Sequence, residues 1–200
     1  MSLPARMMTV LTAVSFLSAS LLVGVNILTV DRIAANKQRE IEAAITHVVP
    51  GTTASSKLYE EKGFAVYNGR DADGRLAGYA IQAAAGGFQD VILLLVGTDP
   101  EVSRIRRLVV LEQKETPGLG AKIVEEGAFL RFWKDRDCRV PLTLRKPPVA
   151  EEELMPTEVN AVTGATISSE AVLAGVNGAL ARFRLLRQEG KIPAEDQNAR

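Results

Sequence analysis

The chain has 200 residues, of which 46% are hydrophobic and 24% charged, so it can bury a core and is not a disordered tail. Lys plus Arg and Asp plus Glu both number 24, and this balance argues against a nucleic-acid-binding protein, which usually carries a clustered basic excess. Cys138 and His47 are the only cysteine and histidine, which excludes an intrachain disulfide, a protein-ligated iron–sulfur cluster and a Cys/His zinc site. Any redox work would therefore need an organic cofactor.

An uncharged stretch covers residues 7–30, after a short N-terminal tail of residues 1–6. At about 1.5 Å per residue it reaches roughly 36 Å as a helix, enough to cross a lipid bilayer. A cleaved signal peptide is the alternative, but the apolar run continues beyond the small residues Ala19 and Ser20. We therefore predict an uncleaved transmembrane helix. Because more basic residues follow the span than precede it, the loop-charge rule by itself places the C-terminal part inside the cell.

The remainder of the chain predicts one compact α+β domain over residues 51–187, joined to the span by a membrane-proximal helix over residues 31–50. Pro50-Gly51 ends that helix, and a polar tail occupies residues 188–200. Alternating and apolar runs predict strands at residues 57–67, 76–84, 91–96, 105–111 and 141–144. Asn68-Gly69 and Asp73-Gly74 are expected turns between the first two of these. A short helix is expected at residues 126–134 and an amphipathic one at residues 168–186.

Thr163-Gly164-Ala165-Thr166 immediately precedes the last predicted helix. The small residues Gly164 and Ala165 allow another group to approach the backbone, and Thr166 falls near a helix N-terminus, where a phosphate is favoured. An ordinary turn with a helix cap explains the same residues.

A second segment, Glu115-Thr116-Pro117-Gly118-Leu119-Gly120, predicts a tight loop that can lie flat against a planar ring, with Leu119 as its apolar contact. A plain surface turn is the alternative. A third segment, residues 86–90, is better explained as a turn leading into a core strand, and Phe132 and Trp133 as packing residues.

Taken together and in this order, the apolar span, the Gly-Gly-Phe turn, ETPGLGAKI and VTGATISSEAV resemble the membrane-anchored FMN-binding domain family. The similarity is greatest to the G-subunit family of Rnf (Rsx) complexes, which are ion-translocating ferredoxin–NAD oxidoreductases. The resemblance extends over essentially the whole chain and is most specific at ETPGLG and TGAT.

This resemblance implies one FMN per chain, attached by its phosphate to Thr166 within the motif formed by Thr163, Gly164 and Ala165. A flavin transferase makes the bond with FAD as donor. The resemblance also implies an electron-relay subunit of an ion pump, with other Rnf subunits and the lipid bilayer as partners. The domain would face the outer side of the bacterial cytoplasmic membrane, which disagrees with the charge count. The residues implied to lie against the flavin are Glu115, Thr116, Gly118, Leu119 and Gly120, with Lys146 and Lys122 as candidates for a nearby cation.

Two features depart from the family pattern. Asn160 stands where family members usually have Asp, six residues before the modified threonine, so either a carboxylate used in modification is missing or the side chain only bonds to the loop backbone. Gln89-Asp90 stands where another glycine is common. A flavin-free assembly module and a stand-alone FMN-domain protein of another respiratory or sensory system remain alternative functions.

Overall fold

A computed structural model describes residues 2–193, and its contacts divide the chain between Ile41 and Glu42. The first unit lies within one unbroken helix, α1 (Leu3–Val48), which includes a stretch long and apolar enough to cross a membrane. None of that stretch is buried against protein. The Thr9 and Thr29 hydroxyls donate to the carbonyls of Ala5 and Val25 at 2.9 and 2.8 Å, so these polar groups are satisfied within the helix.

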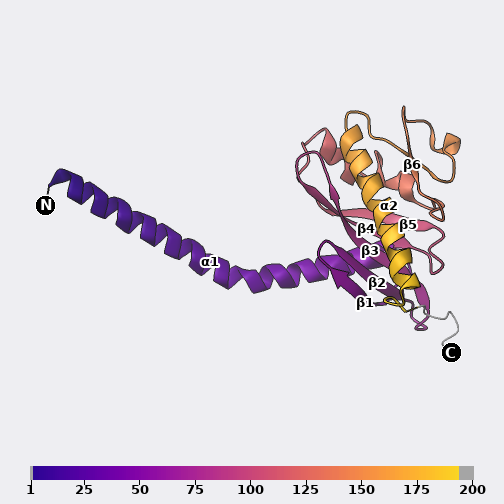
Figure 1. Cartoon of the computed structure of the whole chain (residues 1–200), viewed down its shortest axis with the longest axis horizontal. Coiled ribbons are helices and arrows are strands. Elements are labelled where there is room, and N and C mark those ends of the chain that lie inside the picture. Colours follow the sequence, from indigo (N-terminus) through magenta and orange to yellow (C-terminus); the bar gives the residue numbers. More distant parts are fainter. Residues whose placement is uncertain (1, 194–200) are drawn as a thin grey trace. The chain divides into compact units, whose positions relative to one another are not determined.

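The second unit is built on a five-stranded antiparallel sheet in which each strand pairs with the next along the chain (Figure 1). The strands are β1 (Ala54–Glu61), β2 (Phe64–Arg70), β3 (Leu76–Gly86), β4 (Val91–Thr98) and β5 (Ile105–Glu112). Since short turns can join such neighbours, the meander follows directly from the sequence order. The predicted α+β class is confirmed.

The first hairpin differs from its prediction. Residues 57–67 do not form one strand, because the chain turns at Lys62-Gly63, where Gly63 has a φ of +77°. The predicted turn at Asn68-Gly69 is wrong. Asn68 lies inside β2, where its side-chain oxygen accepts from the Ser56 amide and hydroxyl at 3.0 and 2.6 Å. The asparagine therefore links two strands, which a local turn signal does not distinguish from a turn.

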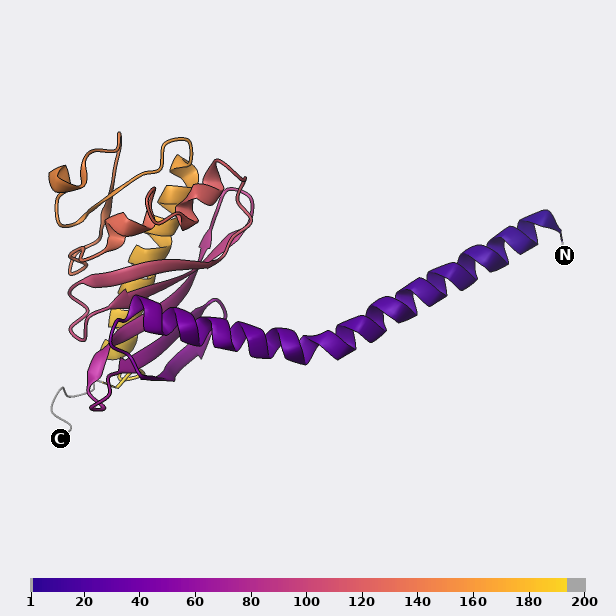
Figure 2. The same ribbon diagram turned by 180° about the vertical axis from the view of Figure 1, so that it is seen from behind.

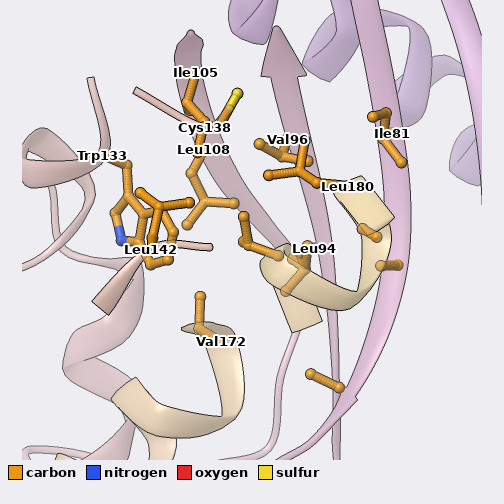
Figure 3. Close-up of a cluster of buried hydrophobic side chains, with 14 of the residues drawn as sticks. Ile81, Leu94, Val96, Ile105, Leu108, Trp133, Cys138, Leu142, Val172 and Leu180 are labelled. Atoms are coloured by element: carbon orange, nitrogen blue, oxygen red, sulfur yellow. The ribbon is translucent and has the colours of Figure 1, made fainter. Parts of the chain in front are cut away.

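Helix α2 (Thr166–Gln188) covers one face of the sheet, so the predicted amphipathic helix is confirmed with slightly wider bounds (Figure 1). Its buried residues Val172 and Leu180 pack with Ile81, Leu94 and Val96 of the sheet (Figure 3). Trp133 and Cys138 lie in the same cluster and are fully buried, which confirms Trp133 as a packing residue.

The last turns of α1 belong to the second unit and cover the opposite face of the sheet (Figure 2). Ile45, Val48 and Val49 are fully buried there. A Cβ built on Gly97 of β4 would stand 2.0 Å from the Val48 carbonyl oxygen. Only glycine at position 97 therefore lets the helix end approach the strand this closely.

Short elements connect β5 to α2. The predicted helix over residues 126–134 is reduced to a 3₁₀ turn, because only Leu130–Trp133 is helical, and the predicted strand at residues 141–144 lies slightly later in the chain. Residues 151–153 also form a 3₁₀ turn. Residues 194–200 of the predicted polar tail lie outside the described residues. The connecting elements are η1 (Gly120–Val124), η2 (Leu130–Trp133), β6 (Thr143–Arg145), η3 (Glu151–Glu153) and β7 (Glu158–Asn160), with β6 and β7 paired in parallel.

Candidate functional site

Three loop segments that are far apart in the sequence converge on one cavity of about 340 Å³. They are the β3–β4 turn, the loop between β5 and η1, and the β7–α2 loop with the first turn of α2. The volume falls within the range of small-molecule sites. The lining residues are Phe88, Glu115, Thr116, Leu119, Gly120, Gly164, Ala165, Thr166, Ile167 and Ser168.

Large apolar side chains at the cavity stay unusually open to solvent. Phe88 is 65% exposed, Leu119 52% and Ile167 55%, and each comes from a different one of the three segments. Gathered apolar surface of this kind, beside polar groups, is typical of a binding site. The site can accept a ligand with a flat apolar body.

The β7–α2 loop brings Thr166 to the cavity as the first residue of α2. Gly164, with a φ of +82°, makes the turn before it, and no side chain caps the helix. The amides of a first helical turn lack acceptors within the helix, and with the helix dipole they favour an anion. The half-buried Thr166 hydroxyl therefore lies where a phosphate is electrostatically favoured.

Ser169 holds this loop in shape from inside the protein. Its buried hydroxyl accepts from the Val162 amide at 3.1 Å and donates to the Ala165 carbonyl at 2.9 Å. The backbone on both sides of the Gly164 turn is thus tied to the helix, which limits the positions that Thr166 can take.

Glu115 is only 4% exposed and joins all three segments. Its Oε2 accepts from the Ser168 hydroxyl at 2.5 Å and its Oε1 from the Gln89 amide at 3.0 Å. Burial by itself raises the pKa of Glu115, but the Ser168 hydroxyl and the amides of the Phe88–Asp90 turn outweigh it and hold the pKa below its ordinary value. Glu115 is thus an ionised, internally bonded residue of the cavity wall.

Two contacts cross between the β3–β4 turn and the β5–η1 loop. The Gln89 side-chain amide donates to the Thr116 hydroxyl at 2.9 Å, and Lys114 pairs with Asp90 at 2.7 Å. Gln89 and Asp90, which stand where another glycine is common in the family, therefore connect the β3–β4 turn to the β5–η1 loop.

Four of the predicted candidates lie outside the cavity lining. Thr163 and Gly118 are exposed in the flanking turns, and Gly118 has a φ of +77°, which suits the conformation of its loop. Lys146 forms an ion pair with Glu170 on α2, and Lys122 lies in η1. Among the described residues, the cavity lining includes no lysine.

Phe88, Ile167 and Ser168 line the cavity but were not predicted as site residues. The Gly-Gly-Phe turn indicated only a route into a strand, and Ile167 and Ser168 are typical of the start of a helix. Phe88 and Ile167 carried a signal that could have identified them as site residues. Each is a single large apolar residue in a polar loop or at a helix start, next to glycine-rich sequence.

The Asn160 side chain bonds to backbone, as the second of its two interpretations expects. The side chain is 1% exposed and bonds to the backbone of Val149 through both its nitrogen and its oxygen. It therefore holds the loop before η3, and it is not among the residues that line the cavity.

Comparison with known proteins identifies the same region. Residues 87–181 match the FMN-binding domain family. The chain is 34% identical over 119 residues to the G subunit of the ion-translocating oxidoreductase complex of Methanosarcina acetivorans, a match that covers 57% of this chain and 55% of that protein. It is 28% identical over 170 residues to the G subunit of the proton-translocating ferredoxin:NAD(+) oxidoreductase complex of Clostridium ljungdahlii, covering 85% and 86% of the two chains.

The similarity to solved structures supports the fold. NqrC of Shewanella oneidensis superposes with a TM-score of 0.55 at 22% identity, over 69% of this chain and 72% of that one. The match to the Methanosarcina protein spans only about half of that protein's length. Residues 87–181 match the FMN-binding domain family, and the chain is similar to the G subunits of ion-translocating oxidoreductase complexes, as the motifs predicted.

Proposed function

We propose that this chain is a membrane-anchored flavoprotein subunit of an ion-translocating ferredoxin–NAD oxidoreductase complex and carries FMN as a phosphoester on Thr166. The observation that carries the proposal is the presence of the Thr166 hydroxyl at the start of α2, on the wall of a cavity with exposed apolar side chains. The phosphate of FMN is favoured at the start of a helix, and its ring system is favoured against apolar side chains, so binding FMN needs both environments side by side. The relatives' names supply the complex.

The residues of the chain divide the binding of FMN among them. The first amides of α2 would face the phosphate, with the bond to phosphorus formed by the Thr166 oxygen. Phe88, Leu119 and Ile167 would contact the ring, and Gly164 leaves room for it. Bound FMN supplies one- and two-electron transfer, which protein side chains cannot. In this assignment the chain relays electrons between neighbouring subunits and is not a catalyst on its own.

The proposal extends to the surroundings of the domain. The apolar part of α1 anchors the chain in the cytoplasmic membrane, and the domain faces its outer side. There a covalent bond keeps the cofactor from being lost by diffusion. A flavin transferase, with FAD as donor, loads Thr166: the threonine oxygen loses its proton and bonds to the phosphorus of the FMN half, while the pyrophosphate bond of FAD breaks and AMP leaves. The other Rnf subunits are the partners of the chain in electron transfer. No charged residue stands in residues 7–30, so other membrane subunits must supply the path of the ion.

The test is flavin fluorescence in a denaturing gel after co-expression with a flavin transferase. We expect a fluorescent band for the wild type and none for Thr166→Val. Thr143→Val is the matched control, since Thr143 is an exposed threonine of β6 that belongs to no predicted site segment and does not line the cavity. It should keep its fluorescence. A dark wild-type band, with an active transferase on a known substrate, would refute the covalent assignment and favour a flavin-free assembly module.

A further inference from the structure

Glu115 places a carboxylate where the three segments that line the cavity meet. Besides the bonds from Ser168 and Gln89, the amides of Phe88 and Asp90 support its negative charge. The donors are a hydroxyl and backbone N–H groups, all of them uncharged. The charge on the carboxylate is therefore stabilised by hydrogen bonds and is not cancelled by an ion pair among these partners.

Two glycines enclose this carboxylate. A Cβ built on Gly87 would lie 2.5 Å from Glu115 Oε1, and one built on Gly120 would lie 2.7 Å from Oε2. Backbone from two loops thus reaches closer to the carboxylate than any residue with a side chain would allow. The side chain is held in a fixed place on the cavity wall and cannot swing into solvent without moving those loops.

Lys114, which adjoins Glu115 in the sequence, and the candidate Lys146 pair with other carboxylates, and the candidate Lys122 of η1 is not among the lining residues. Lys114 pairs with Asp90 at 2.7 Å, and Lys146 pairs with Glu170. Among the lining residues of the cavity, Glu115 is the one side chain with a full charge. A ligand in this cavity therefore lies beside a fixed negative charge that is itself shielded from water, where electrostatic effects are larger than in bulk solvent.

Resting on the proposed attachment of FMN, we propose that Glu115 lowers the redox potential of the bound flavin, with Ser168 as the positioning residue that orients and screens its carboxylate. A fixed negative charge beside an electron acceptor disfavours the addition of an electron. Removing the charge should therefore raise the midpoint potential, and removing the screening hydroxyl should lower it further.

The experiment compares the flavin midpoint potentials of the full-length chain and three variants, all loaded by the transferase. Glu115→Gln keeps the size of the side chain but not its charge, and we expect its potential to be less negative than that of the wild type. Ser168→Ala keeps the charge but removes a donor to it, and we expect a more negative potential. Glu112→Gln is the matched control, because Glu112 is an exposed carboxylate at the end of β5 outside the cavity lining, and its potential should equal that of the wild type.

Opposite shifts in the two variants separate an effect of charge from a general loosening of the loops, which would move both potentials in the same direction. The inference is overturned if Glu115→Gln or Ser168→Ala has the midpoint potential of the wild type, or if both potentials shift in the same direction. If Glu115→Gln does not take up flavin, Ser168→Ala decides alone: a more negative potential supports the inference, and any other result overturns it. A wild type without covalent flavin is a different failure, because it refutes the proposed function itself.

Discussion

Asn160 binds both polar groups of the Val149 backbone. Its Nδ2 donates to the Val149 carbonyl at 2.7 Å, while its Oδ1 accepts from the Val149 amide at 3.1 Å. Asn177 of α2 makes the same pair of bonds to Leu142, both at 2.9 Å. Two asparagines therefore hold the connection between η2 and β7 in place, each at a single residue. A carboxylate has no donor with which to repeat this arrangement.

Replacing Asn160 with the aspartate usual in the family should destabilise this chain. In Asn160→Asp a carboxylate oxygen would face the Val149 carbonyl oxygen, with no hydrogen between them. We expect the free energy of unfolding to fall by about 1–3 kcal/mol, the usual cost of a buried polar group without its partner. Urea unfolding of the full chain in detergent measures it. Asn36→Asp, at an exposed position on α1, should change little, and equal losses in both variants would contradict the explanation.

Two glycines of α2 should respond in opposite ways to alanine. A Cβ on Gly175 would meet the Ala85 Cβ at 2.7 Å, so Gly175→Ala must push the helix away from β3. We expect it to cost about 1–3 kcal/mol. Gly178 has no atom within 4 Å of the same position, and Gly178→Ala should stabilise the helix by about 0.5–1 kcal/mol. Thermal unfolding compares them, and a loss of stability in Gly178→Ala would show that this side of α2 is covered.

Acid should remove the stabilising effect of Glu115. Burial acts to raise the pKa of this carboxyl, but its hydrogen bonds hold it below the ordinary value of 4.5. Because the folded-state pKa is the lower one, the contribution is complete above the unfolded-state pKa and is lost as the pH falls through the folded-state pKa. The difference in unfolding free energy between the wild type and Glu115→Gln should therefore narrow below about pH 4.5. Unfolding curves from about pH 7 to pH 3 test this, and a constant difference would contradict it.

The orientation of the domain can be decided with reporters fused to the C-terminus. If the domain faces outward, a reporter enzyme that folds only outside the cytoplasm should be active, and a fluorescent protein that folds only inside should be dark. The count of basic residues around the uncharged stretch predicts the opposite pattern. A folded domain after the first span weakens that rule, and for this reason we expect the outward result.

Much of the fold is predictable because it depends on local patterns. The apolar run of β4 and the amphipathic face of α2 determine buried elements wherever they occur, and both are found as expected. The first hairpin was not predictable in this way, since Asn68 takes its role from Ser56 on the neighbouring strand. Pairing between strands is information that a single segment does not contain.

In the candidate site too, local motifs predict some features, whereas contacts between distant segments determine others. The motifs indicated Glu115, Thr116, Leu119, Gly120, Gly164, Ala165 and Thr166, which meet at one cavity. Nothing in the ETPGLG segment alone says that Glu115 bonds to Ser168, 53 positions away. Lys146 was chosen for its charge, but its partner on α2 is visible only after folding. Whether each of these residues contacts FMN stays a prediction.

The burial of Ile45, Val48 and Val49 has a practical consequence for anyone who wishes to release the domain from the membrane. The domain begins within the last turns of α1, between Ile41 and Glu42, and not in the turn at Pro50. Truncating the chain at Pro50 would expose the apolar sheet face around Gly97 to solvent and would promote aggregation. A truncation that starts near Glu42 would keep the last turns of α1 as a cover for the sheet.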